Sequence, residues 1–379
     1  MMGGAIARDL LDADEQAQVT LLDSDEARLE RVAEKLGSPR LRQRVVDVLN
    51  ASETAAALET HAVAISALPH GLSLPAIEAG IGAGVCVVDL VGEAPAERAA
   101  LAERAVAAGV LVVPGCGVAP GISNICVGRG VELLDETENA VIYVGGIPRR
   151  KKGPLQYETV FLLESVFNAY LRPVHAIIGG KPVVMEPRSD LEQVEFPEPI
   201  GILEAFNNDG LASLLLTVGG EIVGDLVEKT MRYPGHVERV GFLEECGLLG
   251  KDSVRCGGAE VIPIDLLTGV LGPRMGLGPE GDILAMRVVV EGTKDGKCRR
   301  HVFELVDYFD PVKGETAMAR TTGFSATCAA RLIASGAIKE RGVLFPEQLF
   351  AGEHYEAFVA ELSQKGVLIT HDQEPGPTT

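Results

Sequence analysis

Two neighbouring stretches near the start of the chain decide the fold, Met1-Met2-Gly3-Gly4-Ala5-Ile6-Ala7 and Val19-Thr20-Leu21-Leu22-Asp23. The first predicts a helix that begins at Gly3, and the second predicts a short buried strand that ends in a carboxylate. Together they resemble the second half of a dinucleotide-binding unit, in which Gly-x-Gly-x-x-Gly joins a strand to a helix. Gly3 would be the third glycine, which allows helix and strand to pack closely. Asp23 would accept hydrogen bonds from the adenosine ribose, or alternatively cap the next helix.

The first two glycines of that motif, and the strand before them, would fall ahead of Met1. Because the helix and the second strand are intact, we expect the true start to lie upstream of Met1. The alternative is a protein that lacks its pyrophosphate-binding turn. The sequence therefore predicts an N-terminally truncated form of this fold.

Apolar runs alternate with helical stretches as far as Val113, which predicts a doubly wound parallel (Rossmann) sheet of the α/β class. The expected strands are Val19–Leu22, Val45–Val48, Ala62–Ala67, Val85–Leu90 and Val110–Val113. The expected helices are Asp25–Leu36, Ser52–Leu58, Leu74–Gly80 and Ala96–Gly109. The Gly- and Pro-rich stretch 114–124 is expected to be irregular and to lead into a second domain, with an ordinary linker as the alternative.

After Glu138 the pattern predicts a second, mixed α+β domain. Its expected strands are Val141–Gly145, Val174–Ile178, Pro182–Met185, Leu226–Arg232, Asp282–Glu291 and Arg299–Asp307. Its expected helices are Glu158–Tyr170, Gly210–Val218, Val237–Cys246 and Ile264–Leu271. A small-residue helix at Thr316–Ile338 is expected to return to the first domain. We therefore expect a first domain at 1–122 completed by 316–350, a second domain at 123–315, and a disordered tail at 366–379.

Composition excludes several classes of function. The net charge of −20 disfavours nucleic acid as a partner, because phosphate binding needs clustered cations. No apolar run is long enough to span a membrane and no signal peptide opens the chain, so we expect no membrane partner. Seven cysteines without paired spacing predict reduced thiols in the cytoplasm and no metal site. The acidic excess favours a cationic small-molecule substrate.

Several short motifs occur in a fixed order from Met1 to about Phe350. They are Met1–Ala7, Gly115–Gly121, Tyr143–Pro148, Pro154–Tyr157, Phe206–Leu211, Lys229–His236 and Ala319–Phe324. In this order and spacing they resemble the saccharopine dehydrogenase family. The resemblance implies a discontinuous first domain that binds a nicotinamide cofactor, a second domain that binds the substrate, and a homo-oligomer formed through the second domain's sheet.

Two positions indicate a branch of that family. Saccharopine-forming members carry Asp where this chain has Ala119, and Arg where it has Asn208. An Arg fork holds a carboxylate through two bonds and Asn cannot replace it, so a smaller substrate is implied. We expect NAD-dependent oxidation of L-lysine at its side-chain amine, giving a semialdehyde that cyclises. The alternatives are reductive condensation of an aldehyde with an amine, as in saccharopine or carboxyspermidine formation, and a non-catalytic dinucleotide-fold scaffold.

The carboxyl ends of parallel strands meet at the edge of a doubly wound sheet where ligands bind. The residues expected to bind the cofactor are Gly3, Asp23, Asp47, Leu68, Pro69, His70, Asp89, Gly115 and Gly117. Asp23 favours NAD over NADP, because its carboxylate would repel a 2′-phosphate and Arg28 lies five residues on. A turn residue is the alternative for Asp47, and a surface histidine for His70.

Oxidation of an amine needs a neutral nitrogen, so the site needs a base as well as a grip for the substrate carboxylate. The expected catalytic residues are His236, Tyr157 and Lys229, each with a structural or solvated position as the alternative. The expected substrate-binding residues are Tyr143, Gly145, Arg232, Tyr233 and Thr322. Among these, Arg232 would hold the α-carboxylate, and Thr322 would cap the ligand at the start of the C-terminal helix.

Overall fold

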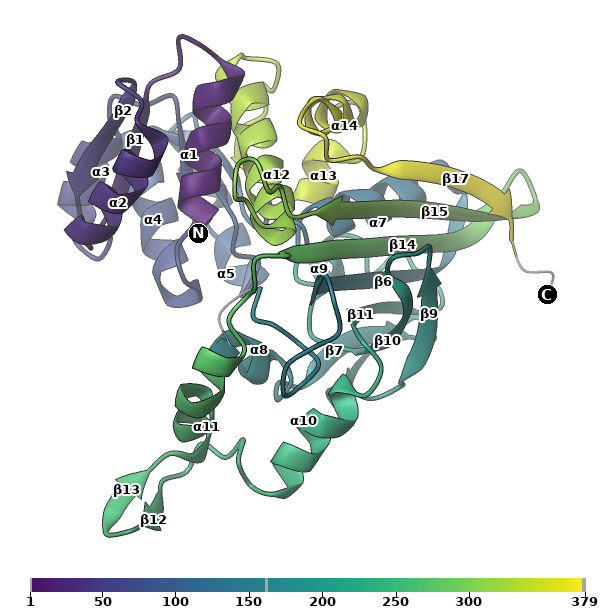
Figure 1. The fold of residues 1–379 in the computed structure, drawn as a ribbon. Coiled ribbons are helices and arrows are strands. Elements are labelled where there is room, and N and C mark those ends of the chain that lie inside the picture. Colours follow the sequence, from purple (N-terminus) through teal and green to yellow (C-terminus); the bar gives the residue numbers. More distant parts are fainter. Residues whose placement is uncertain (1, 161–162, 377–379) are drawn as a thin grey trace. The chain divides into compact units, whose positions relative to one another are not determined.

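The computed structural model describes residues 2–160 and 163–376, which form two compact units (Figure 1). Unit 1 consists of Met1–Asp135, Ala212–Glu221 and Ala319–Ile369. Unit 2 consists of Glu136–Leu211, Ile222–Met318 and Thr370–Thr379. The first boundary therefore lies at residue 135 instead of 122, because the helix that follows residue 121 packs within unit 1.

Unit 1 is built on parallel strands. β3 (Val63–Ser66), β4 (Cys86–Asp89), β5 (Leu111–Val113) and β16 (Gly342–Val343) form one sheet in the order β16-β5-β4-β3. β1 (Val19–Asp23) pairs in parallel with β2 (Leu41–Val45) in a second sheet. The predicted α/β class and parallel pairing are therefore confirmed. The prediction of a strand at Val45–Val48 was wrong, because β2 precedes it with a polar Leu-Arg-Gln-Arg-Val sequence that carries little hydrophobic signal.

The helices of unit 1 cover these sheets and are α1 (Met2–Ala13), α2 (Glu26–Leu36), α3 (Ala51–Leu58), α4 (His70–Ala83), α5 (Pro95–Ala99), α6 (Ala102–Ala107), α7 (Ile122–Leu133), α9 (Leu214–Thr217), α12 (Ala317–Ala334), α13 (Pro346–Phe350) and α14 (Tyr355–Gln364). α4 lies so close to β4 that a Cβ on Gly80 would stand 2.2 Å from Val87 Cγ2. α7 corrects the prediction that 114–124 is irregular throughout, since its first turn begins at Ile122. Within α7, a Cβ on Gly128 would lie 3.1 Å from Glu347 Cβ of α13.

α12 packs against α1 through a buried polar cluster. Asp9 of α1 accepts a hydrogen bond from Thr327 Oγ1 at 2.5 Å and from Arg331 Nη1 at 2.8 Å, and it pairs with Lys365 Nζ at 2.9 Å. Two cations for one buried carboxylate hold the pKa of Asp9 below its usual value even though burial acts to raise it. This contact places α12, from Ala319 onward, in unit 1.

Unit 2 is a mixed sheet in the order β17-β15-β14-β6-β11-β10-β9, in which β6 and β11 pair in parallel and the other neighbours are antiparallel. Its strands are β6 (Glu136–Pro148), β7 (Val174–Ile178), β8 (Lys181–Met185), β9 (Glu192–Phe196), β10 (Gly201–Asn207), β11 (Leu226–Arg232), β14 (Asp282–Lys294), β15 (Lys297–Tyr308) and β17 (Thr370–Pro375), with a separate β12 (Val254–Cys256) and β13 (Ala259–Val261) hairpin. Its helices are α8 (Leu163–Ala169), α10 (His236–Glu245), α11 (Pro263–Leu271) and the 3-10 turn η1 (Gly272–Arg274). The predicted second, mixed domain is therefore confirmed.

β17 corrects the prediction of a disordered tail. Residues Thr370–Pro375 pair with Glu304–Arg299 of β15 and add an edge strand to the sheet. The strand was missed because its sequence, Thr-His-Asp-Gln-Glu-Pro, is polar and exposed, so that only backbone pairing defines it. Residues 377–379 of the predicted tail lie outside the described part of the chain.

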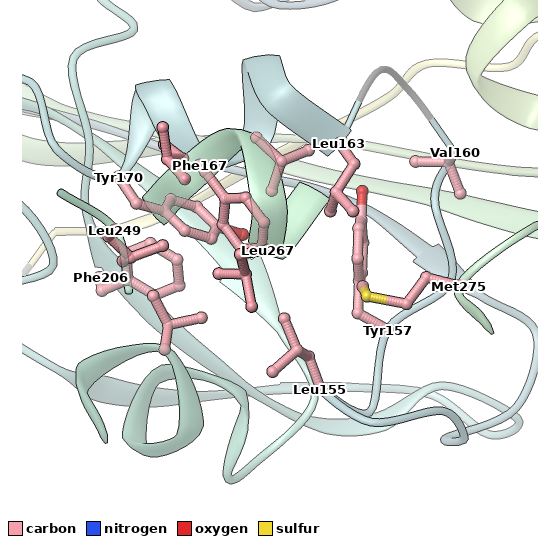
Figure 2. Close-up of a cluster of buried hydrophobic side chains, with 13 residues drawn as sticks. Leu155, Tyr157, Val160, Leu163, Phe167, Tyr170, Phe206, Leu249, Leu267 and Met275 are labelled. Carbon is pink, nitrogen blue, oxygen red and sulfur yellow. The ribbon is translucent and has the colours of Figure 1, made fainter. Parts of the chain in front are cut away.

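The larger core of unit 2 lies between the sheet and its helices. Figure 2 shows part of this core, in which aromatic side chains from β10, α8 and the loops beside it meet Leu267 of α11. Tyr157, Phe167, Tyr170 and Phe206 are each no more than 2 % exposed. This core supports the side of β11 that carries the candidate site.

Candidate functional site

Strand β11 divides the predicted site residues between two faces of the sheet. Side chains alternate along a strand, so Glu228, Thr230 and Arg232 point to one face, called here the even face, and Lys229 and Met231 to the other, the odd face. Each of these five residues is less than 10 % exposed. The predicted residues therefore cannot all line one pocket.

On the even face, a chain of hydrogen bonds begins at Arg232. Arg232 Nε donates to Tyr170 Oη at 2.9 Å, and Tyr170 Oη lies 3.1 Å from His236 Nε2. His236 Nδ1 lies 2.8 Å from the carbonyl oxygen of Leu155. Because a carbonyl only accepts, Nδ1 carries the hydrogen and Nε2 accepts from Tyr170. Both nitrogens of His236 are therefore satisfied in its neutral form.

This arrangement argues against the predicted catalytic role of His236. Burial, with Arg232 nearby, lowers the pKa of His236 to about 3. The side chain is 1 % exposed and its free lone pair is already used by Tyr170. His236 instead fixes the position of Tyr170 and, through it, of Arg232.

Tyr157 belongs to the core of unit 2 and not to a reactive surface (Figure 2). It is 1 % exposed, the guanidinium of Arg232 lies over its ring at 4.9 Å, and it makes an edge contact with His236 at 5.5 Å. Burial raises the pKa of Tyr157, so it stays a neutral phenol. We read it as packing support for Arg232 and not as a proton acceptor.

Arg232 is held by neutral groups only. Its Nη1 donates to the carbonyl oxygen of Met231 at 2.8 Å, its Nε donates to Tyr170, and two aromatic rings flank it. Among the described residues no carboxylate lies within ion-pair distance of Arg232, which is 9 % exposed. A buried cation without a counter-charge is costly unless an anion joins it, so this residue suits an anionic ligand group.

On the odd face, Lys229 is fully paired, which contradicts a role as a free base. Its Nζ lies 2.6 Å from both Asp190 Oδ2 and Glu192 Oε1. Tyr143 donates to the same Glu192 at 3.1 Å. A groove of about 290 Å³ opens beside these residues, and its arginines are paired too, Arg287 with Glu304 at 2.5 Å. The odd face is therefore a structural ion-pair network.

The other predicted substrate residues of β6 and β11 join this odd face. A Cβ on Gly145 would lie 2.5 Å from the backbone oxygen of Met231, so Gly145 is needed for close strand packing. Tyr233 is 7 % exposed and donates to the carbonyl oxygen of Pro148 at 3.1 Å. Tyr143, Gly145 and Tyr233 thus lie on the opposite side of the sheet from Arg232, and their predicted role as substrate ligands beside it is not supported.

In unit 1, Asp23 ends β1 as predicted, and Arg28 lies beside it. The carboxylate accepts from Asp25 N at 3.0 Å and pairs with Arg28 Nη1 at 3.2 Å. Arg28, in the first turn of α2, lies beside the strand end, which its spacing of five residues did not suggest. Gly3 gives no support to its predicted packing role, because a Cβ there would meet nothing within 4 Å.

The loops after β2 and β3 carry the next predicted cofactor residues. Asp47 is exposed and its carboxylate accepts from Leu49 N at 3.0 Å, as a turn residue does. Pro69 is the N-cap of α4 and follows the half-buried Leu68. His70 opens α4 and its Nδ1 lies 3.1 Å from Glu93 Oε2. His70 and Glu93 are both partly exposed and lie at the strand ends where a dinucleotide binds in such sheets.

Asp89, at the end of β4, is buried and used internally. Its Oδ2 accepts from Ser73 Oγ at 2.5 Å, and Ser73 accepts from Arg98 Nη2 at 2.9 Å. Arg98 Nη1 also donates to the carbonyl oxygen of Glu93. Asp89 is 0 % exposed and burial raises its pKa. It therefore orders the loop after β4, and any contribution to cofactor binding is indirect.

The turn after β5 is built from glycines that no other residue could replace. Gly115 has φ 74° and Gly121 has φ 132°, and a Cβ on Gly121 would overlap the backbone oxygen of Gly117. A Cβ on Gly117 itself would lie 3.3 Å from Thr322 Cγ2. Thr322 stands in the second turn of α12, past the free N–H groups of the helix start, so the prediction that it caps a ligand there was wrong.

One group of side chains among the described residues has the spacing of a cation site. Glu340, Glu353 and His354 are close enough to share a cation, but His354 already bonds to Glu340 at 2.8 Å. Among the described helices, none combines the length and apolar character that a bilayer crossing requires.

A parallel α/β unit with an acidic residue at the end of β1, followed by a mixed-sheet unit, defines a two-unit nicotinamide-dinucleotide oxidoreductase. The saccharopine dehydrogenase NADP binding domain matches residues 1–113, and the saccharopine dehydrogenase C-terminal domain matches residues 117–367. The chain therefore belongs to the saccharopine dehydrogenase family.

Two relatives illustrate the match. The mitochondrial alpha-aminoadipic semialdehyde synthase of Bos taurus is 22% identical over 325 residues, which cover 67% of this chain and 34% of the relative. The chain thus spans about a third of that protein's length. The solved structure of saccharopine dehydrogenase (L-Glu forming) from Saccharomyces cerevisiae is 20% identical, covers 98% of both chains and has a TM-score of 0.82, which shows the same fold.

Proposed function

We propose that this protein oxidises L-lysine at its side-chain amine with NAD, giving 2-aminoadipate 6-semialdehyde, which cyclises. The observation that carries the proposal is Arg232, a buried cation that is held in place by neutral groups and has no carboxylate partner among the described residues. From the family resemblance we further propose a cytoplasmic homo-oligomer.

Arg232 would bind the α-carboxylate of the substrate. Its guanidinium is fixed by Tyr170 and by the backbone of Met231, so little side-chain entropy is lost when an anion binds. A carboxylate would also supply the ion-pair partner that Arg232 lacks among the described residues. The requirement for this group distinguishes an amino acid from a simple amine as the substrate.

The size of the substrate follows from Ala119 and Asn208. The branch of the family that forms saccharopine carries Asp and Arg at these positions, which suit a larger, doubly acidic molecule. Here Asn208 lies beside the carboxyl group of Glu228 on the even face. Neither Ala119 nor Asn208 can bind a second carboxylate through two hydrogen bonds, as an arginine would. The even face therefore suits a molecule with one carboxylate and one amine.

For the cofactor we propose NAD, with Asp23 accepting the hydrogen bonds of the adenosine ribose. Arg28 is a feature that would favour NADP instead, because its guanidinium lies beside Asp23, where it could bind a 2′-phosphate. Asp23→Ser is expected to weaken NAD binding about tenfold or more, since a charge-assisted hydrogen bond is lost. Titration calorimetry with NAD and NADP on both proteins measures this, and equal loss for the two cofactors would contradict the ribose contact.

The proposed reaction is tested by incubating the purified protein with L-lysine and NAD and following the absorbance of NADH. We expect NADH formation with L-lysine, with little from an aliphatic amino acid that lacks the side-chain amine. No NADH from any cationic amino acid, in protein shown by calorimetry to bind NAD, would contradict the proposal. Consumption of NADPH with a semialdehyde and an amine would instead support reductive condensation.

A further inference from the structure

The even face of β11 carries one more ionisable group, Glu228, which no motif singled out. Its side chain is 3 % exposed, and Thr230 Oγ1 lies 3.4 Å from its Oε1. Its Oε2 has no hydrogen-bond partner among the described residues. Gly210 covers that oxygen, since a Cβ there would lie 2.4 Å from it. Buried carboxyl oxygens are usually hydrogen-bonded. Asp89 Oδ1 and Glu347 Oε2 in unit 1 also lack a partner among the described residues, but Glu228 is the one of these three that lies on the face of β11 that carries Arg232.

The charge state of Glu228 is set by its surroundings. Burial raises the pKa of Glu228 to about 8, against the lowering effects of Asn208, Thr230 and Arg232. The nearby carboxylate of Asp209 also acts to raise it, although His175 Nδ1 pairs with Asp209 at 3.1 Å. Near neutral pH, Glu228 therefore exchanges readily between its acid and its carboxylate form, as a general base requires.

The other candidate bases of unit 2 are occupied. His236 is neutral with both nitrogens bonded, Lys229 lies on the opposite face between two carboxylates, and Tyr157 is a buried phenol. Glu228 shares its face with Arg232, four residues along the same strand, which separates the two Cα atoms by about 13 Å. An extended lysine is about 7 Å long from its carboxylate carbon to its side-chain nitrogen. The two side chains can therefore hold opposite ends of one lysine molecule.

We propose that Glu228 accepts the proton from the side-chain ammonium of the substrate while Arg232 holds its α-carboxylate, an inference that rests on the proposed function. Asn208 favours this arrangement because its neutral amide, and not a cation, lies beside the carboxyl of Glu228. An arginine at position 208 would pair with Glu228 and remove the base.

The proton and electron balance is complete. Bound NAD⁺ takes up the hydride when the Cε–H bond of the substrate breaks. Glu228 removes one proton from the ammonium, so that the nitrogen lone pair forms the C=N bond, and later gives this proton to solvent. Water adds to the C=N bond and ammonium leaves. The sum is lysine, NAD⁺ and water giving the semialdehyde, NADH, ammonium and one proton.

The test is Glu228→Gln, which keeps the shape of the side chain and removes its basicity. At pH 7 and saturating NAD we expect kcat for L-lysine to fall about 10²–10⁴-fold with KM nearly unchanged. The kcat of the variant should then rise tenfold per pH unit towards the amine pKa of about 10.4, because free amine no longer needs a base. In the unchanged protein, kcat/KM should rise steeply with pH up to about pH 8, where Glu228 loses its proton, and should rise less steeply above that pH.

Glu347→Gln is the matched control. Glu347 in α13 is also a buried glutamate with a raised pKa, and it accepts from Thr217 Oγ1 at 2.7 Å in unit 1. We expect this variant to keep the kcat and the pH profile of the unchanged protein. Thermal unfolding and NAD titration of both variants establish that they are folded and bind cofactor.

The outcomes separate the two proposals. If the unchanged protein oxidises lysine but Glu228→Gln keeps its kcat within threefold and its pH profile, Glu228 is not the proton acceptor, while the proposed function stands. If the unchanged protein does not oxidise lysine, the proposed function itself fails. Should Glu228→Gln not fold, Thr230→Val is the second variant, because it removes a group that lowers the pKa of Glu228. The rise of kcat/KM with pH should then shift to higher pH. A rise at the same pH as in the unchanged protein overturns the proposal.

Discussion

The two faces of β11 hold buried charges in opposite ways. On the odd face, Lys229 lies between two carboxylates at 2.6 Å each. On the even face, Arg232 is fixed by a phenol and a carbonyl oxygen, and Glu228 has an oxygen without a partner. One strand therefore carries a closed ion-pair network on one side and two incompletely paired groups on the other.

The difference shows how to separate structural charges from functional ones in a buried sheet. Buried charges that form ion pairs within the protein belong to the fold. Removing one partner destabilises the protein, because the other charge stays buried without a counter-charge. Charges that the protein orients but does not pair are the ones that a ligand can complete. Motif positions alone cannot make this distinction, because Lys229 and Arg232 belong to the same motif.

The largest expected effect is on the even face. Arg232→Lys keeps the charge but loses the fork and the bond to Tyr170, so kcat/KM for L-lysine should fall about 10- to 100-fold, mostly through KM. Steady-state kinetics at saturating NAD measures this. An unchanged KM in a folded variant would show that Arg232 does not bind the carboxylate of the substrate.

Lys229→Met should act on stability and spare catalysis. The loss of one cation from two carboxylates should lower the free energy of unfolding by about 1–3 kcal/mol, less than for a fully buried pair because both carboxylates are partly exposed. Urea unfolding gives the stability, and kinetics with L-lysine should stay within about twofold. A large loss of kcat with little loss of stability would restore Lys229 as a catalytic candidate.

Two tyrosines offer a matched pair across the sheet. Tyr170→Phe breaks the link between Arg232 and His236 and should cost about 1–2 kcal/mol of stability and raise KM several-fold. Tyr143→Phe removes a hydrogen bond to a partly exposed carboxylate and should cost less than about 1 kcal/mol with no change in KM. Similar kinetic effects for both variants would mean that the two faces do not differ in function.

The smallest effect concerns the acid stability of the even face. The pKa of His236 is lowered in the folded protein to about 3, from an unfolded value of 6.5, so its contribution is present above pH 6.5 and is lost as the pH falls. Between pH 6.5 and 5.5 this loss is about 1 kcal/mol. Urea unfolding at the two pH values should show a smaller loss for His236→Gln than for the unchanged protein, and an equal slope would contradict the neutral state of His236.

Hydrophobic patterns predicted the fold well where strands are apolar. Val174–Ile178 was predicted to the residue, because its sequence Val-His-Ala-Ile-Ile is mostly apolar and β-branched. Polar strands were missed: only Val141–Gly145 was recognised in β6, because the preceding residues Glu136–Asn139 are polar, and β9 and β17 were missed entirely. The more apolar β10, Gly-Ile-Leu-Glu-Ala-Phe-Asn, was missed as well. Such strands form through pairing with distant partners, which a local pattern does not contain.

The surroundings of the candidate site residues could not be predicted from the sequence. Arg232 and His236 were recognised by a motif, but the neutral state of His236 follows from its burial near Arg232, and its hydrogen-bond partner Tyr170 lies 66 residues away in sequence. The signal for Glu228 was available, because alternation along Leu226–Arg232 places it on the face of Arg232. Its missing partner and the cover of Gly210 are tertiary features that no sequence pattern shows.

The central claim, that the even face of β11 binds the amino-acid end of the substrate through Arg232, is tested most directly by one comparison of kcat/KM values. L-Lysine and 1,5-diaminopentane, which lacks the carboxylate, are compared on the unchanged protein and on Arg232→Lys. We predict that the loss of the carboxylate costs the unchanged protein about 10- to 100-fold and the variant much less, because the same interaction is already gone. An equal loss in both proteins would show that Arg232 does not bind the carboxylate and would contradict the account.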